Sequence, residues 1–140
     1  MPLSPVEQAD RNSRNRGTLM AIAAIVQLAL ALFSALDPVG TTNFVRGIVW
    51  AVLTLLWLIL LATGGGVLLS REVRSMMNDE VSQLNRRRAI ETGFWTAMAA
   101  AIGLYFASYS WPVPTRAGLA ILTEVAIAAA LIRYAWLELR

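Results

Sequence analysis

The sequence predicts an all-α integral membrane protein, a bundle of four transmembrane helices arranged as two in–out–in hairpins. Of its 140 residues, 57% are hydrophobic and only 15% are charged, whereas an average soluble domain is about one quarter charged. The charges are clustered, so long apolar stretches separate them. Four of these stretches approach the length of about 20 residues that a helix needs to cross a bilayer.

The expected spans are about 17–36, 47–69, 92–110 and 117–137. The first three contain no charged residue, and the fourth contains Glu124 and Arg133. The first apolar run is longer than that of a typical signal peptide and follows a polar segment, so we expect a retained helix. Residues 1–16 are therefore predicted to be a cytoplasmic segment, and residues 17–140 to form one membrane domain.

The distribution of arginine predicts the orientation of the spans. Ten of the twelve arginines lie in the N-terminal segment, in the connection between spans two and three, and at the C-terminal end. The other two connections contain only Arg46 and Arg116. Because basic residues are retained on the cytoplasmic side, both ends and the central segment are expected there. All basic residues are arginine, which is typical of a GC-rich bacterial genome, so the bacterial inner membrane is the predicted location.

Residues 70–91 form the main polar segment and are predicted to be a short cytoplasmic stalk. An apolar stripe at helical spacing is formed by Val73, Met76 or Met77, Val81 and Leu84. Asn78, followed by two acidic residues, indicates the start of a helix that continues from about Asp79 through Ser110. On this helix Arg87 and Glu91 are four residues apart and can pair. The glycines at 64–66, near the base of the stalk, indicate a kink or a close helix contact.

The arginine cluster of the stalk, Arg86, Arg87 and Arg88, is open to two interpretations. It can fix the topology and contact anionic lipid headgroups. Alternatively, it can be a docking surface for a membrane or cytoplasmic protein. Nucleic-acid binding is not expected, because the segment lacks a broad basic face and stacking aromatic residues.

A layer of polar residues is predicted inside the membrane. Its members are Gln27, Thr54, Tyr105 and Glu124, one from each span. Counting about 1.5 Å per residue from the span ends places the first two and Glu124 at similar depth, and the Tyr105 ring can direct its hydroxyl toward that layer. An ionisable group costs at least about 2.5–3.5 kcal/mol at the bilayer centre, so Glu124 is a candidate functional residue. The layer can join helices by hydrogen bonds, bind a proton or cation, or face lipid by accident.

Small residues indicate where helices pack closely. Spacing of four residues relates Ala99, Gly103 and Ala107 in span three and Ala126 and Ala130 in span four. This pattern predicts that spans three and four form a tight pair, or that they contribute a face for a homo-oligomer. The two hairpins also resemble each other weakly, since spans two and four each contain a Leu-Thr pair after an initial arginine. A duplication is one explanation, and shared composition is the other.

The sequence gives little indication of catalysis. Without cysteine or histidine, disulfide exchange and histidine-ligated haem or zinc are excluded, and no cofactor, metal or enzymatic activity is expected. We predict a non-catalytic subunit, scaffold or regulator that acts through the stalk. The alternative is a small proton-coupled transporter or channel that uses Glu124. In size and number of spans the chain is similar to the small multidrug resistance transporters, but their first-span acid is missing here, so the resemblance concerns architecture alone.

Overall fold

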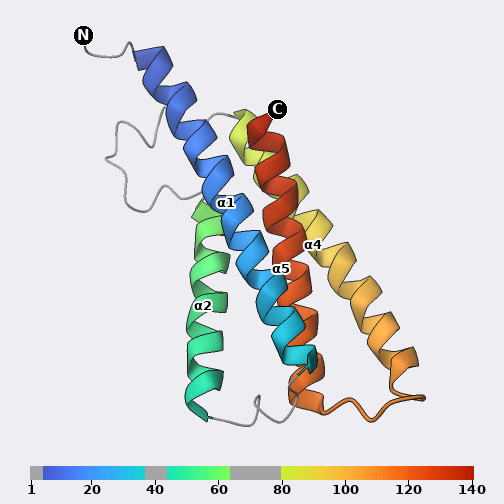
Figure 1. The fold of residues 1–140 in the computed structure, drawn as a ribbon. Helices are drawn as coiled ribbons and strands as arrows, with labels where there is room; N and C mark the ends of the chain where they lie inside the picture. Colours follow the sequence, from blue (N-terminus) through green and yellow to red (C-terminus); the bar gives the residue numbers. More distant parts are fainter. Residues whose placement is uncertain (1–4, 37–43, 64–79) are drawn as a thin grey trace.

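The computed structural model describes residues 5–36, 44–63 and 80–140, and these residues form four helices with no strand among them (Figure 1). The helices are α1 (Pro5–Leu36), α2 (Phe44–Thr63), α4 (Glu80–Ala107) and α5 (Thr115–Leu139). The prediction of an all-helical chain is confirmed for the described residues. Two segments, Arg14–Leu36 and Thr115–Leu139, are long and apolar enough to cross a membrane, judged by length and composition. The apolar segment Gly47–Thr63 is shorter.

The helix ends differ from the predicted spans in ways that local chemistry explains. α1 begins well before the apolar run, because no proline or glycine interrupts the polar residues that follow Pro5. α4 ends at Ala107, whose carbonyl accepts from the amides of Ser110 and Trp111 in a turn that leads to Pro112. α5 starts directly after Pro114. Three predicted parts of the chain lie outside the described residues: most of the first outer connection (37–43), the glycines at 64–66 and the stalk residues 70–79.

Helix α5 occupies the centre of the molecule. It packs along α1 and along α4, and less extensively against α2. Its buried residues recur every three or four positions on several faces, as expected for a helix with neighbours on more than one side. Successive helices run in opposite directions (Figure 1). α1 packs far more on α5 than on α2, so the two hairpins of the proposed repeat are not packed alike.

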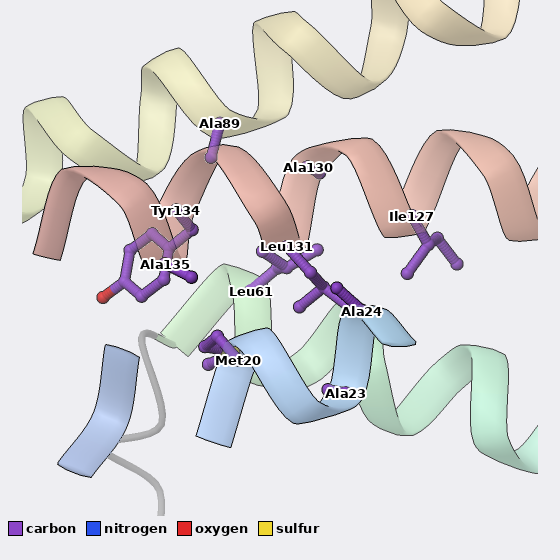
Figure 2. Close-up of a cluster of buried hydrophobic side chains, with 10 residues drawn as sticks. All are labelled: Met20, Ala23, Ala24, Leu61, Ala89, Ile127, Ala130, Leu131, Tyr134 and Ala135. Atoms are coloured by element: carbon purple, nitrogen blue, oxygen red, sulfur yellow. The ribbon is translucent and has the colours of Figure 1, made fainter. Parts of the chain in front are cut away.

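The hydrophobic core lies toward one end of the bundle, where α2 and α5 end and α4 begins; we call this the packed end. Figure 2 shows Met20 and Ala24 of α1 facing Leu131 of α5, with Leu61 of α2 beside them. Tyr134 is completely buried in the same cluster. The opposite end, where α1 and α4 end and α2 and α5 begin, is here called the open end.

Close contact between α4 and α5 occurs through Gly93. A Cβ atom at this position would lie 3.0 Å from the carbonyl oxygen of Ala126 and 3.0 Å from the Cβ of Ala130. The predicted small residues of α5 therefore do meet α4. On α4, however, Gly103 would meet nothing within 4 Å, and Ala99 is exposed. At Ala99 and Gly103 the predicted stripe does not make this contact, because α4 diverges from α5 toward the open end (Figure 1).

Large apolar side chains cover the outside of all four helices. Examples are Ile25 and Phe33 on α1, Leu55 on α2, Phe106 on α4 and Ile132 on α5. Buried polar residues, by contrast, include Gln27, Thr54 and Glu124. In a soluble bundle, by comparison, large apolar residues are mostly buried and polar residues are mostly exposed.

Candidate functional site

Three of the four predicted polar residues are buried between the helices. Gln27 of α1 and Glu124 of α5 are each 1% exposed, and Thr54 of α2 is 8% exposed. Each belongs to a different helix, so three elements contribute to one polar region. Glu124 lies on a buried stripe of α5 between Ala120 and Ile127.

The contacts at the packed end fix the relative positions of Gln27 and Glu124. Arg16 of α1 lies beside Glu138 of α5, and the two helices run in opposite directions (Figure 1). At about 1.5 Å per residue from this pair, Gln27 and Glu124 are at depths that differ by about one helical turn. Thr54 lies seven residues before Leu61, and Glu124 lies seven residues before Leu131. Because Leu61 and Leu131 pack in the same core and α2 and α5 run in the same direction, Thr54 and Glu124 are at similar depth. The three residues therefore form a band, here called the polar band.

The hydroxyl of Thr54 behaves differently from those of other threonines in the helices. The hydroxyls of Thr18, Thr63, Thr92 and Thr123 each donate to the backbone carbonyl four residues earlier, a common arrangement for threonine in helices. Within the described part of the chain, the Thr54 hydroxyl has no hydrogen-bond partner, and neither has the Gln27 side-chain amide. Buried groups of this kind call for an explanation such as a water, an ion or a ligand.

Tyr105 lies outside the polar band. Its side chain is 59% exposed, and its hydroxyl lies 2.8 Å from that of Tyr109, in the turn that follows α4. The prediction that the ring would reach the layer assumed that α4 follows α5 along its whole length. Because α4 diverges at the open end, the ring of Tyr105 remains on the surface and packs edge-on against Tyr109.

A cavity of about 540 Å³ lies among α1, α2 and α5 at the open end. Its wall is mostly apolar and includes the aromatic residues Phe44 and Trp50. The charged residues of the wall are Arg116, which is exposed, and Glu124, which is buried. They are eight residues apart on α5, or about 12 Å along the helix axis. The buried carboxyl group therefore lies at the inner end of a cavity whose outer rim carries an arginine.

The hydrophobic core lies beyond the polar band, toward the packed end. Ile127 and Leu131 of α5, with Ala24 of α1 and Leu61 of α2, form the part of the core that faces the band, and Trp57 packs against this core. Figure 2 shows the side chains of Ala24, Leu61 and Leu131 converging between the helices. Along α5, the cavity residues from Arg116 to Glu124 therefore precede the core residues from Ile127 to Ala135.

The three stalk arginines have different surroundings. Arg86 donates a hydrogen bond from Nη1 to the carbonyl oxygen of Ala62, at the end of α2. Arg87 pairs with Glu91 across an exposed 3.5 Å contact, and Arg88 is exposed. Arg86 thus holds α2 against α4, whereas the other two present their charges at the surface.

A second polar cluster, not predicted from the sequence, joins three helices at the packed end. Nη2 of Arg16 lies 2.7 Å from Oε1 of Glu138, and the two side chains are 12% and 5% exposed. The same Nη2 donates to the Ser82 hydroxyl of α4 at 3.1 Å, and the guanidinium lies 5.4 Å from the centre of the Tyr134 ring. Both Arg16 and Glu138 flank predicted spans. Their pairing was not predicted, because they are 122 residues apart and no local spacing relates them.

Comparison with protein-family models, with curated proteins and with solved structures finds no match to this chain. No group of three or more acidic side chains that could hold a metal ion is present in residues 5–36, 44–63 and 80–140. Any functional assignment therefore depends on the geometry of the polar band, the cavity and the exposed arginines.

Proposed function

We propose that this chain is a four-span protein of the bacterial inner membrane, with both termini and the central segment in the cytoplasm. One observation carries the proposal: large apolar side chains cover the outside while Gln27, Thr54 and Glu124 are buried. Lipid can solvate such a surface and water cannot. The alternating directions of the helices (Figure 1) and the arginine distribution support the orientation. The packed end is then cytoplasmic and the open end faces outward.

Single-cysteine labelling tests this topology cleanly, because the chain contains no cysteine. Ser110→Cys places a thiol at the open end, and Gln83→Cys places one at the beginning of α4; both positions are exposed. An impermeant maleimide added to intact cells lacking an outer membrane should label the first variant and label the second only after lysis. Labelling of both in detergent provides the control. Labelling of Gln83→Cys in intact cells would reject the orientation.

Within the membrane, we propose that the protein acts as a non-catalytic subunit, scaffold or regulator. The supporting observation is that Arg87 and Arg88 are exposed on α4 beyond its apolar part. Such a pair of cations can be recognised by an acidic surface of a partner protein. Arg86 is excluded from this surface because it bonds to Ala62, so the proposed contact is narrower than the full arginine cluster.

Photo-crosslinking from Leu84, which is exposed one turn before Arg88, tests this role. A specific protein adduct is expected, and it should disappear in Arg87→Glu/Arg88→Glu. The matched control is Arg11→Glu/Arg14→Glu, which reverses two exposed arginines of α1 and should retain the adduct. If the adducts contain lipid alone, the arginines serve topology and headgroup contact instead.

The cavity supports a second candidate function, a small proton-coupled transporter or channel. Here the specific observation is a buried carboxyl group at the inner end of a cavity among α1, α2 and α5. Proton flux into proteoliposomes should be lost in Glu124→Gln and retained in Glu91→Gln, which removes an exposed acid of α4. Equal flux in the two variants would remove Glu124 from the mechanism.

A further inference from the structure

We propose that Arg88 of α4 and Arg133 of α5 together bind the phosphate of an anionic glycerophospholipid in the inner leaflet. The inference rests on the membrane topology proposed above and goes beyond it, because it names a lipid class and the two residues that recognise it. Arg133 takes no part in the proposed contact with a partner protein, so the two proposals can be tested separately.

The two arginines lie at almost the same level of the bundle. A Cβ atom at Gly93 of α4 would lie 3.0 Å from the Cβ of Ala130 of α5, so these two positions are opposite each other. Arg88 lies five residues before Gly93 and Arg133 lies three residues after Ala130. Because α4 and α5 run in opposite directions (Figure 1), both arginines are displaced toward the packed end, by about 7.5 and 4.5 Å.

The two arginines also lie on the same side of the α4–α5 pair. Ala89, which is completely buried, points from α4 toward α5 (Figure 2), and Tyr134 is buried one turn after Ala130. Arg88 precedes Ala89 by one residue, and Arg133 precedes Tyr134 by one residue. A step of one residue turns the side chain by about 100° around a helix. In two antiparallel helices that face each other, this step leads to the same side of the pair.

Both guanidinium groups are available to an anion. The two side chains are exposed and have no ion-pair or hydrogen-bond partner among residues 5–36, 44–63 and 80–140. The acids nearest to them in the sequence are engaged by other arginines, Glu91 by Arg87 and Glu138 by Arg16. The planar guanidinium group presents parallel N–H donors that match the oxygens of a phosphate. Two such groups on one side of a helix pair therefore suit a single phosphate between them.

The depth of this pair corresponds to the phosphates of the inner leaflet. Arg116 is exposed at the open end of α5, and Arg133 lies seventeen residues farther along the same helix. The two are therefore about 25 Å apart along the axis, which is close to the hydrocarbon thickness of about 30 Å. If Arg116 marks the outer boundary of the hydrocarbon, Arg133 marks the inner one.

The surface between the arginine pair and the membrane centre suits an acyl chain. Thr92 and Trp95 lie four and seven residues after Arg88, and Ala129 lies four residues before Arg133, so all three share the side of the arginines. Thr92 and Ala129 are half-buried, and Trp95 is exposed. Small side chains allow close approach in a membrane, and the Trp95 ring adds apolar surface beside them. This continuation favours a phospholipid over a free phosphate.

Native mass spectrometry of the full chain in micelles, titrated with lipids that have identical acyl chains, measures the preference. Phosphatidylglycerol should bind at least tenfold more tightly than phosphatidylcholine. Arg88→Gln and Arg133→Gln should each weaken phosphatidylglycerol binding at least fivefold. Each effect should be smaller in the background of the other, because the two residues share one phosphate. The control variants Arg14→Gln and Arg116→Gln remove exposed arginines of α1 and α5 and should change the affinity less than twofold.

Three results would overturn the proposal: equal binding of the two lipids, full phosphatidylglycerol affinity in Arg133→Gln, or equal weakening in all four variants. Inorganic phosphate serves as the soluble competitor. If it displaces the lipid at a concentration equal to that of the lipid, the arginine pair binds a free phosphate and the lipid site is rejected. Absence of lipid preference in a chain whose cysteine labelling is as expected rejects this site but not the membrane topology.

Discussion

The two ends of this molecule are built on different principles. At the packed end, Gly93 brings α4 against α5, Tyr134 is completely buried, and Arg16 joins three helices through Glu138 and Ser82. At the open end, α4 diverges and a cavity separates α2 from its neighbours. The contacts that hold the helices together are therefore concentrated at the packed end, whereas the open end contains the cavity. Substitutions at the open end can change the cavity without disturbing the core.

The largest effect is expected from Arg16→Met. This change leaves the Glu138 carboxylate buried without its 2.7 Å partner, and breaking a buried ion pair costs about 3–5 kcal/mol. The free energy of unfolding in mixed micelles, followed by tryptophan fluorescence, measures it. Arg87→Met breaks the exposed pair with Glu91 and should cost less than about 1 kcal/mol. Equal losses of unfolding free energy in the two variants would show that the buried pair at the packed end stabilises the fold no more than the exposed pair does.

Gly93→Leu is expected to have the next largest effect. A side chain there would press on the backbone of Ala126 and on Ala130, and overpacking of this kind costs about 1–3 kcal/mol. The same unfolding experiment on Gly103→Leu should show no loss, because that position is open. The prediction fails if the two glycines respond alike, since α4 would then not pack as the structure indicates.

Arg86→Met should have a smaller effect, limited to the junction of α2 and α4. It removes the hydrogen bond to the Ala62 carbonyl, and a hydrogen bond of this kind contributes about 1 kcal/mol. Hydrogen exchange of the last turn of α2 should increase in this variant. Arg88→Met, which removes an exposed neighbour, is the control and should leave the exchange unchanged.

The smallest effect is expected at the glycines with open surroundings. Gly47→Ala and Gly103→Ala introduce a methyl group where nothing lies within 4 Å, and alanine is favoured over glycine in a helix by roughly 0.5–1 kcal/mol. Both variants should unfold at slightly higher denaturant concentration than the unmodified chain. A loss of stability in Gly47→Ala would contradict the open surroundings of Gly47, because it would show that another helix packs closely against α2 there.

Some features could be predicted because they depend on short-range sequence patterns. The helical content followed from apolar runs, and the described part of the predicted stalk helix, from Glu80 onward, is helical as expected. The burial of Gln27 and Glu124 could be anticipated, because polar groups in apolar helices are costly wherever lipid surrounds them. The pair of Arg87 and Glu91 followed from their spacing on one helix.

Other features depend on how helices cross, which no local pattern specifies. The ring of Tyr105 was expected to reach the polar layer, but it lies on the surface because α4 diverges from α5. Ala89 and Gly93 are small residues of α4 that pack toward α5, whereas Ala99 and Gly103 of the predicted stripe are exposed. In an alanine-rich helix several faces carry small residues, and only the crossing geometry selects one.

The sequence by itself determined that the chain is helical, which segments are apolar, and which polar residues would be expensive to expose to lipid. The tertiary structure decided that α5 is central, that Arg16 pairs with Glu138, and that Glu124 lies at the inner end of a cavity. The reason is physical. Helix formation and hydropathy depend on neighbours within a few residues, whereas cavities and buried ion pairs arise where segments far apart in the chain meet or fail to meet.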